Sequence, residues 1–450
     1  MRRYESYKDS GVEWLGEIPS HWEVKKMKFL FKDTSIKNKP DETLLSVTQN
    51  RGVIPRDWLE ERTVMPSGSL ETFKFIEKDD FAISLRSFEG GLEICHHDGI
   101  ISPAYTVLKY NKKLLNNGYY KYLFKCQKFI SEMQTSIVGI REGKNISYEE
   151  LKYSFIPIPQ TNEQQKIAQF LDDKTAKIDQ AVDLAEKQIA LLKEHKQILI
   201  QNAVTRGLNP DVPLKDSGVE WIGKVPEHWE VKKITHIFPN IGSGTTPNSS
   251  DPSFYEGNIN WLQTGDLTDG YIYKTSKTIT HKALQTYSTL KIYPKNSLVI
   301  AMYGATIGKV GLLQIETTTN QACCVLSAAL NIEMKFIFYL FQGIKESLVA
   351  MSYGGGQPNI SQEKIKSLKL PFPNMSEQQR IVDYLDTQTA KINQAIALKT
   401  AHIEKLKEYK SVLINDVVTG KVRVSVLKVR SKNPMDFEYW RDNLGVMNKF

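Results

Sequence analysis

The sequence has little that would support a disulfide-stabilised or membrane-spanning protein. Its 4 cysteines, Cys95, Cys126 and the adjacent pair Cys323 and Cys324, show no CxxC spacing. This excludes a disulfide framework and a cysteine metal site, so we expect core thiols. The longest apolar runs are six residues, far below the roughly 20 that cross a bilayer. The first residues are charged but lack an apolar segment, which predicts a cytoplasmic protein with no secretion signal and no membrane contact.

Catalytic arrangements are also missing from the sequence. Residues 304–310 resemble a phosphate-binding loop, but Val310 stands where Ser or Thr would bind magnesium. Residues 251–254 approximate the (Asp/Asn)-Pro-Pro-aromatic element of amino-methyltransferases, with Ser253 in place of the second proline. The run 96–98, His-His-Asp, has no further ligand at useful spacing. We expect turns at all three places, and no catalysis, metal or cofactor in this chain.

Length and charge set the broad class. A chain of 450 residues predicts two or three domains, and a hydrophobic fraction of 41% predicts that most of it folds. The 59 basic and 51 acidic side chains give a net charge of +8, which favours association with polyanions only mildly. Any binding of nucleic acid must therefore come from local basic surfaces.

The strongest signal is an internal duplication. Residues 8–26 and 215–233 share 15 of 19 positions at an offset of 207, and residues 159–181 and 373–395 share 13 of 23 at an offset of 214. Between these shared segments, residues 27–144 and 234–358 have little visible similarity. The chain is two tandem units with a common frame and different interiors, a pattern that suits two modules doing the same kind of work on different targets.

The shared segments after each module predict two long helices, 161–207 and 375–424. Their apolar residues alternate spacings of three and four, as in a coiled coil. Asn162 and Ser376 stand where an N-cap would begin each helix. We expect the helices to pack against each other antiparallel, although each could instead lie on its own module. The predicted seam residues are Leu171, Ile178, Val182, Ile189, Leu192, Leu199, Leu385, Ile392, Ile396, Ile403, Leu406 and Leu413.

Antiparallel pairing of two direct repeats predicts a pseudo-two-fold arrangement, with the helices acting as a ruler between two readers of double-stranded DNA. The modules mix short β-rich runs, at 81–86, 104–108 and 297–303, with helices near 118–133 and 334–351. This predicts an α+β or α/β fold. The expected domains are 1–160, a first module; 161–207, a first spacer helix; 208–374, a second module; 375–424, a second spacer helix; and 425–450, a C-terminal tail.

Polar, glycine-rich loops in both modules are candidates for DNA contact. Such loops bring backbone N–H groups close to phosphates, while Arg, Lys, Gln and Asn reach base edges. Each loop taken alone could equally be an ordinary tight turn. The candidate residues are Arg86, Ser87, Arg141 and Lys144 in the first module and Thr245, Thr246, Lys309, Gln357 and Asn359 in the second.

The twin KDSGVEW–G–P–HWEVKK segments and the twin EQQ–I–LD–TAKI helices resemble the DNA-specificity subunit of type I restriction-modification systems. The resemblance covers residues 4 to about 424, whereas the tail 425–450 departs from the family pattern. It implies two target-recognition domains that each read one half of an asymmetric, interrupted DNA sequence. It also implies a helical spacer that binds two modification subunits.

The same resemblance assigns the chemistry to partners. Modification subunits would methylate adenine with S-adenosylmethionine, and restriction subunits would use ATP and Mg. This chain would be non-catalytic. Two other readings stay open at this point, a duplicated coiled-coil scaffold that binds protein or RNA and a solitary methyltransferase, although the latter lacks any cofactor apparatus in the sequence.

Overall fold

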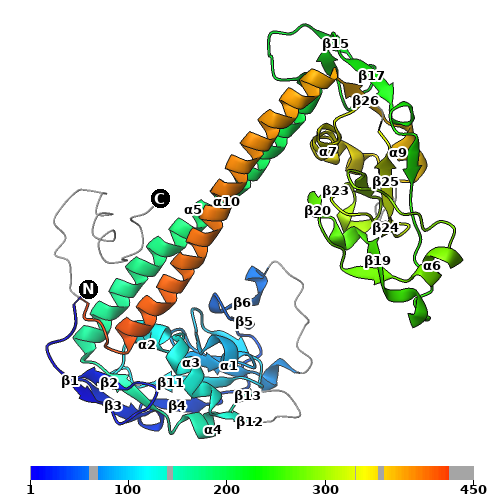
Figure 1. Ribbon diagram of the computed structural model, residues 1–450. Helices are drawn as coiled ribbons and strands as arrows, with labels where there is room; N and C mark the ends of the chain where they lie inside the picture. Colours follow the sequence, from blue (N-terminus) through cyan, green and yellow to red (C-terminus); the bar gives the residue numbers. More distant parts are fainter. Residues whose placement is uncertain (1, 60–68, 139–144, 330, 353–358, 425–450) are drawn as a thin grey trace. The chain divides into compact units, whose positions relative to one another are not determined.

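The computed structural model describes residues 2–59, 69–138, 145–329, 331–352 and 359–424 (Figure 1). The chain forms two compact units, residues 1–184 with 402–450 and residues 185–401. We call these the first and second unit. The division passes through both long helices, so each unit contains one module and one part of each helix. The five domains expected from the sequence divide the chain by repeat instead, and they stay a prediction.

The two long helices are α5 (Thr161–Arg206) and α10 (Met375–Val418). Each helix begins one residue before its predicted N-cap. Asn162 and Ser376 therefore lie inside the helices, and that prediction is wrong. In α10 the cap is Asn374, whose side-chain oxygen accepts a hydrogen bond from the Glu377 amide at 2.9 Å. After each helix comes a glycine with positive φ, Gly207 or Gly420, which is a common way for a helix to end.

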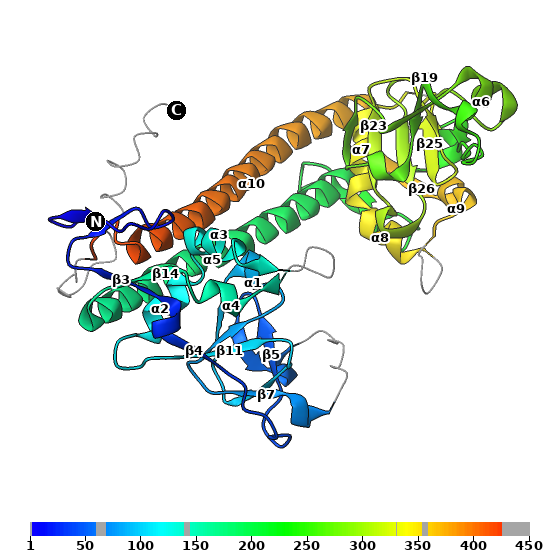
Figure 2. The same ribbon diagram turned by 90° about the horizontal axis from the view of Figure 1, so that it is seen from below.

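The two helices run antiparallel, as predicted (Figures 1 and 2). In the second unit, Lys399 Nζ of α10 donates to Gln188 Oε1 of α5 at 2.6 Å. Further along α5, Lys196 Nζ donates to Asn393 Oδ1 at 2.9 Å, which is an earlier residue of α10. In the first unit, the corresponding pair is Lys410 of α10 with Asp179 of α5, at 2.6 Å.

The module of the first unit is built from short antiparallel strands. Its largest sheet has the order β4-β11-β8-β9, and the pairs β1–β2, β14–β3, β5–β6, β10–β7 and β12–β13 surround it. The strands are β1 (Tyr7–Asp9), β2 (Glu17–Pro19), β3 (Glu23–Lys26), β4 (Phe31–Thr34), β5 (Leu45–Thr48), β6 (Gly52–Pro55), β7 (Lys74–Ile76), β8 (Phe81–Ile83), β9 (Glu93–Ile94), β10 (Gly99–Ile101), β11 (Thr106–Tyr110), β12 (Ile137–Val138), β13 (Asn145–Ile146) and β14 (Phe155–Ile158). The helices are α1 (Ser87–Gly90), α2 (Asn117–Leu123), α3 (Gln127–Gln134) and α4 (Tyr148–Leu151).

The module of the second unit has a five-stranded sheet of order β18-β25-β22-β23-β20 and a three-stranded sheet of order β21-β19-β24. The pairs β20–β23 and β19–β24 are parallel, and the other strand pairs are antiparallel. The strands are β15 (Leu214–Asp216), β16 (Lys224–Pro226), β17 (Glu230–Lys233), β18 (Asn240–Gly242), β19 (Tyr255–Leu262), β20 (Gly270–Ile272), β21 (Lys277–Ile279), β22 (Leu298–Ala301), β23 (Val310–Leu313), β24 (Thr318–Thr319), β25 (Cys323–Ser327) and β26 (Lys369–Phe372). The helices are α6 (His281–Thr286), α7 (Met334–Gly343), α8 (Lys345–Ala350) and α9 (Gln362–Ser367).

Mostly antiparallel sheets with separate helices make the fold α+β, one of the two classes expected from the sequence. The helix predicted near 334–351 is broken into α7 and α8 at Ile344, directly after Gly343. A Cβ atom on Gly343 would lie 2.9 Å from Val204 Cγ2 of α5, so α7 and α5 approach each other closely at this point. The Gln197 side chain of α5 donates to the freed carbonyls of Gln342 and Gly343, at 2.9 and 3.4 Å.

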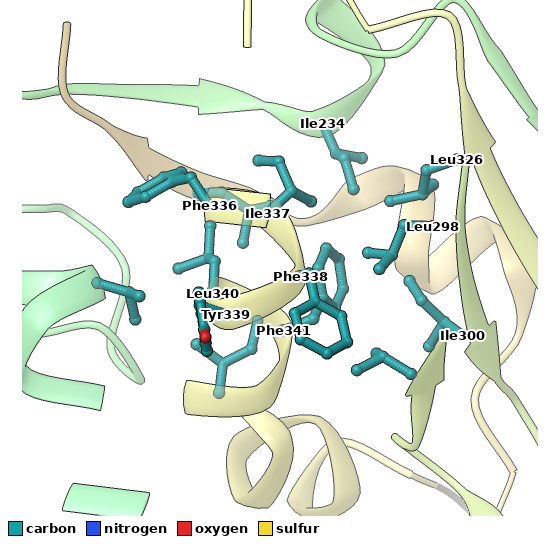
Figure 3. Packing of buried hydrophobic residues seen from close by; sticks show 14 of the residues in the cluster. Ile234, Leu298, Ile300, Leu326, Phe336, Ile337, Phe338, Tyr339, Leu340 and Phe341 are labelled. Atoms are coloured by element: carbon teal, nitrogen blue, oxygen red, sulfur yellow. The ribbon is translucent and has the colours of Figure 1, made fainter. Parts of the chain in front are cut away.

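The core of the second unit surrounds α7, which is apolar on nearly all sides (Figure 3). Phe338 and Phe341 of α7 lie in one buried cluster with Leu298 and Ile300 of β22 and Leu326 of β25. A second large cluster organises the first unit and includes Trp22 and Phe124.

The four cysteines are buried and free, which confirms the prediction of core thiols. Burial raises the pKa of the Cys126 thiol to about 11 and that of Cys324 to about 12. Both thiols are therefore protonated at neutral pH, and a buried thiol is a poor nucleophile.

Candidate nucleic-acid interface

A duplicated glutamate attaches each module to the first turn of its long helix. In the first unit, Glu163 of α5 accepts hydrogen bonds from Trp22 Nε1 at 3.0 Å and from the Tyr4 hydroxyl at 2.7 Å, and it contacts His21 Nε2 at 2.9 Å. Burial, together with the Glu163 carboxylate, raises the pKa of Tyr4, so this phenol stays a donor.

The second unit repeats only part of this arrangement. Glu377 of α10 contacts His228 Nε2 at 2.8 Å. The indole N–H of Trp229 is buried and, within the part of the chain that is described, has no hydrogen-bond partner. The HWEVKK segment is thus docked on the glutamate of the EQQ segment in both units, with fewer bonds in the second.

The next residue of each EQQ segment ties the module's backbone to the same helix turn. Gln164 Oε1 accepts from the Asn116 amide at 2.7 Å, and its side-chain amide donates to the Pro159 carbonyl at 2.8 Å. Gln378 makes the corresponding bonds to the Glu333 amide, 2.9 Å, and the Pro373 carbonyl, 2.8 Å. Both glutamines are fully buried, so these polar groups bind the backbone just before α2 and α7.

A third duplicated contact lies two turns further along each helix. In the first unit, the Tyr122 hydroxyl of α2 donates to Asp172 at 2.8 Å and contacts Thr175 at 3.0 Å. In the second unit, the Tyr339 hydroxyl of α7 makes the same two contacts with Asp386, 2.7 Å, and Thr389, 3.3 Å.

A lysine joins each of these aspartates. Lys121 of α2 pairs with Asp172 at 2.6 Å, and Lys335 of α7 pairs with Asp386 at 3.0 Å. In the sequence, these shared residues were interpreted only as markers of the repeat. Their role as module anchors was missed, although their identical spacing in both helices was the available signal.

The predicted seam residues all lie on the buried side of the two helices. Leu171, Ile178, Leu385, Ile392, Ile403 and Leu413 are buried, and Val182, Ile189, Leu192, Leu199, Ile396 and Leu406 are half-buried. The lysines at seam positions, such as Lys196, are half-buried too. Burial lowers the pKa of Lys196.

In the first unit, the predicted loop residues separate into exposed and buried ones. Arg86 is exposed and stands directly before α1. Ser87 is 1% exposed, and its hydroxyl accepts a hydrogen bond from the Ser84 amide at 2.8 Å. A side-chain contact from Ser87 to DNA is not available in this conformation, because the hydroxyl holds the loop turn. Arg141 and Lys144 lie outside the described residues. The strand β13 that follows them contacts α1.

An ion pair between the half-buried Lys125 and the buried Glu93 is linked to the Arg86 loop through Gln49. Lys125 Nζ pairs with Glu93 of β9 and donates to the Gln49 carbonyl at 2.9 Å. Burial raises the pKa of Glu93 to about 7, and the Lys125 charge opposes this. A Cβ atom on Gly90, in α1, would lie 3.3 Å from the Gln49 side chain. The loop thus packs against Gln49, which Lys125 and Glu93 hold in place.

In the second unit, the Gly-Ser-Gly-Thr-Thr loop is held closely against Thr319, the last residue of β24, and against Gln321 beyond it. A Cβ atom on Gly244 would lie 1.7 Å from the Thr319 carbonyl oxygen, so only glycine fits there. The Thr245 carbonyl accepts from Trp261 Nε1 at 3.2 Å, and the Thr246 hydroxyl donates to Gln321 Oε1 at 2.7 Å. Thr246 and Gln321 are exposed.

The same module brings Asn359 beside Tyr303 through an isolated antiparallel bridge. Both are exposed, and the Met302 amide donates to the Ala322 carbonyl at 2.8 Å, which joins this pair to the segment of Gln321. We call Thr246, Gln321, Tyr303 and Asn359 the polar rim. Gln321 and Tyr303 were not among the candidate DNA-contact residues predicted from the sequence.

The remaining candidates are not part of the polar rim. Lys309 is half-buried in a tight turn in which its amide donates to the Thr306 carbonyl at 2.9 Å, and among the described residues no observed contact joins it to the rim. Gln357 lies outside the described residues. Two of the three expected turns are present: residues 304–306 form a short 3-10 turn, and Asp251 accepts from the Ser253 amide at 2.9 Å. Residues 96–98 contain only a bend, at His97.

The described part of the chain holds neither a cluster of metal-binding side chains nor a helix that could span a membrane. In residues 2–59, 69–138, 145–329, 331–352 and 359–424, no three His, Cys, Asp or Glu side chains gather as a metal site would require. None of the helices in that part of the chain is long and apolar enough to cross a membrane.

Comparisons with known proteins agree with the repeat and the fold. Residues 20–193 and 226–407 each match the family model of the type I restriction modification DNA specificity domain. The MjaVIII specificity subunit of Methanocaldococcus jannaschii, a type I restriction enzyme subunit, is 27% identical over 73% of this chain and 76% of its own length. The putative MjaX specificity subunit of the same organism is 24% identical over 91% of this chain and 96% of its own length.

Solved structures show the same fold. A chain from a study of complex assembly and conformational transition of the type I R-M system superposes with a TM-score of 0.70, at 15% identity, over 90% of this chain and 99% of that chain. The HsdS subunit from Thermoanaerobacter tengcongensis gives a TM-score of 0.54, at 16% identity, over 90% and 98%. With its two matched domains, the chain belongs to the family of type I restriction-modification DNA specificity proteins.

Proposed function

We propose that this chain is the non-catalytic subunit that reads an asymmetric, two-part DNA sequence for a type I restriction-modification complex. The observation that carries the proposal is that the two modules share their anchor residues but differ in their loops. Glu163, Gln164 and Asp172 recur as Glu377, Gln378 and Asp386, yet the loops that these anchors support differ between the modules. Two different readers on one frame suit two different half-sites.

Base readout would come from the exposed loop side chains. Arg86 in the first module can donate to base edges or phosphates in the major groove, and the amide side chains of Gln321 and Asn359 can do so in the second. The hydroxyl of Thr246 adds a short polar contact. Because these loops are tight and packed against the rest of the module, their exposed side chains are held in place. Such fixed side chains favour recognition of particular DNA bases.

The partners in this proposal are double-stranded DNA, two modification subunits and restriction subunits. The two helices carry exposed apolar residues at equivalent positions, at the offset of 214. These are Leu184, 57% exposed, with Leu398, 65%, and Ile198, 47%, with Val412, 51%. Each unit holds one such residue from each helix. One exposed apolar residue from each helix in each unit supports docking of one copy of the same partner on each unit.

The cofactors belong to the partners in this proposal. S-adenosylmethionine would bind in the modification subunits, which methylate adenine, and ATP and Mg would bind in the restriction subunits. The chain would act in the cytoplasm. Its own contribution is to select the DNA sequence and to hold the modification subunits there.

Methylome sequencing tests the proposal directly. Cells that carry this chain with its modification subunit should show adenine methylation at one asymmetric motif made of two unequal half-sites. Cells without the chain should lack it. A symmetric motif, or methylation unchanged by loss of the chain, would argue for a scaffold that binds protein or RNA instead.

The partner surface has its own test. Leu184→Glu with Val412→Glu should remove one of the two modification subunits, because a charged side chain cannot be buried in an apolar contact at low cost. The matched pair Leu398→Glu with Ile198→Glu should remove the other. Analytical ultracentrifugation of the complex should show the loss of one subunit each time. Full retention in both variants would exclude these residues as the docking sites.

A further inference from the structure

One face of the β3–β14 sheet in the first unit gathers exposed aromatic rings and lysines. Phe29 is 66% exposed, Tyr153 49% and Phe155 37%. Phe155 of β14 is paired directly with Lys26 of β3. The pairing continues beyond β3, because the Lys28 amide donates to the Lys152 carbonyl at 2.9 Å.

The lysine ammonium groups lie over these rings. Around the Tyr153 ring, Lys28 Nζ is 4.9 Å from the centroid, Lys152 Nζ 5.4 Å and Lys26 Nζ 5.8 Å. Lys26 Nζ is also 5.2 Å from the Phe155 centroid, and Lys28 Nζ is 5.1 Å from that of Phe29. Cation–π contacts of this kind hold flexible lysine side chains in one region, so less freedom is lost when they bind a ligand.

Most of the charge on this face is uncompensated. Lys152 pairs with Glu149. Among the described residues, neither Lys26 nor Lys28 forms an ion pair with a carboxylate. Ammonium groups gathered around one ring repel each other, and an anion placed over the face would relieve that repulsion.

The second unit keeps the charge of this face but not the rings. In the β17–β26 pair, Lys233 stands opposite Lys369, which takes the place of Phe155. Ser367 takes the place of Tyr153 at the offset of 214, and Lys366 that of Lys152. Lys233 and Lys369 are exposed. Positive charge is therefore the property that the two modules share here, which favours a polyanion over an apolar partner.

We infer that these two sheet faces bind the DNA phosphate backbone outside the bases that the loops read. The inference rests on the proposed function, since it takes DNA as the ligand. The face of the first unit, Lys26 and Lys28 with Phe29, Tyr153 and Phe155, is the more preorganised of the two. Contacts to phosphates position a protein on DNA without reading its sequence.

The test measures DNA affinity over a salt series with the full chain assembled with its modification subunits. Lys26→Gln with Lys28→Gln should weaken binding of target and non-target duplexes alike, by roughly tenfold or more, and should reduce the slope of log K against log salt by about two, because about one counterion is released per phosphate contact. Lys233→Gln with Lys369→Gln should do the same. Lys291→Gln with Lys295→Gln, at exposed lysines that belong to neither sheet face, is the charge-matched control and should leave the slope unchanged.

Three results would overturn the inference. An unchanged slope and affinity would show that these lysines do not contact DNA. A loss confined to the target duplex would make them base readers. Intact DNA binding with a loss of modification subunits would make the face a protein contact. If the unsubstituted complex itself shows no preference for its target, the proposed function fails instead, and the salt slopes on non-target DNA still decide the role of the face.

Discussion

At the scale of single residues, the two duplicated glutamates, Glu163 and Glu377, differ in the number of side chains that they bind. Glu163 accepts from the buried Trp22 indole and the half-buried Tyr4 hydroxyl and contacts a histidine, whereas Glu377 makes only the histidine contact among described side chains. Both carboxylates lie in the first turn of a long helix, where a negative charge also interacts favourably with the helix dipole.

This difference predicts unequal costs for the same substitution. Glu163→Ala should lower the free energy of unfolding by about 2–3 kcal/mol, because it leaves the buried Trp22 indole and the half-buried Tyr4 hydroxyl without their acceptor. Glu377→Ala should cost about 1 kcal/mol. Urea unfolding followed by tryptophan fluorescence compares the two variants. Equal losses would show that the extra hydrogen bonds at Glu163 contribute nothing to stability.

The buried Glu93 predicts a pH dependence. Its pKa in the folded protein, about 7, lies above its ordinary value of 4.5 because burial disfavours the charge. The folded state therefore binds this proton more tightly than the unfolded state does. The resulting stability is fully present below pH 4.5 and is lost as the pH rises through 7.

Glu93→Gln should remove this part of the pH dependence. The difference in stability between wild type and variant should change by roughly 3 kcal/mol between pH 4.5 and 8, in the direction that favours the variant at high pH. Asp80 is also buried, with a pKa of about 6, but it is present in both proteins and cancels. Denaturant unfolding at both pH values measures the change, and a constant difference would contradict the prediction.

At the scale of elements, the loops are where the two modules differ. The Arg86 loop rests on the Glu93–Lys125 pair, and the polar rim is held by Gly244 and by the bridge between Tyr303 and Asn359. The two loops therefore differ in the contacts that hold them as well as in sequence.

Arg86→Ala should weaken recognition of one half-site only. Binding to duplexes in which either half-site is scrambled separates the two contributions, and the expected loss is about 1–3 kcal/mol on the half-site of the first module. Thr246→Ala is the matched change in the second module and should affect the other half-site. If Arg86→Ala weakens binding equally on every sequence, Arg86 contacts a phosphate and not a base.

At the scale of the whole molecule, the helices connect the two modules, and their function as a ruler stays a prediction. The seam repeats every seven residues, so removing one heptad keeps the seam in register. Residues 187–193 of α5 face residues 395–401 of α10 across the helix pair, as the contacts of Gln188 with Lys399 and of Lys196 with Asn393 indicate.

Deleting both stretches should shorten the gap between the half-sites. Seven residues of helix correspond to about 10 Å, which is about three base pairs of DNA. Methylome sequencing of cells with the deleted chain should show the same two half-sites with a shorter gap. An unchanged gap would refute the ruler.

The sequence by itself determined the repeat, the helical pair and the family, because these depend on local periodicity and on near-identical segments. It also placed the cysteines in the core. It misplaced the helix starts at Asn162 and Ser376, since the cap at Asn374 depends on one local hydrogen bond that several neighbouring polar residues could make.

Only the tertiary structure decided which loop residues are available. Ser87 and Arg86 are neighbours in a polar glycine-rich loop, yet one is buried against Ser84 and the other is exposed. Likewise, Tyr303 and Gln321 meet Asn359 and Thr246 only because strands distant in the sequence converge. Exposure and long-range proximity arise from packing between distant segments, and no local pattern in the sequence encodes them.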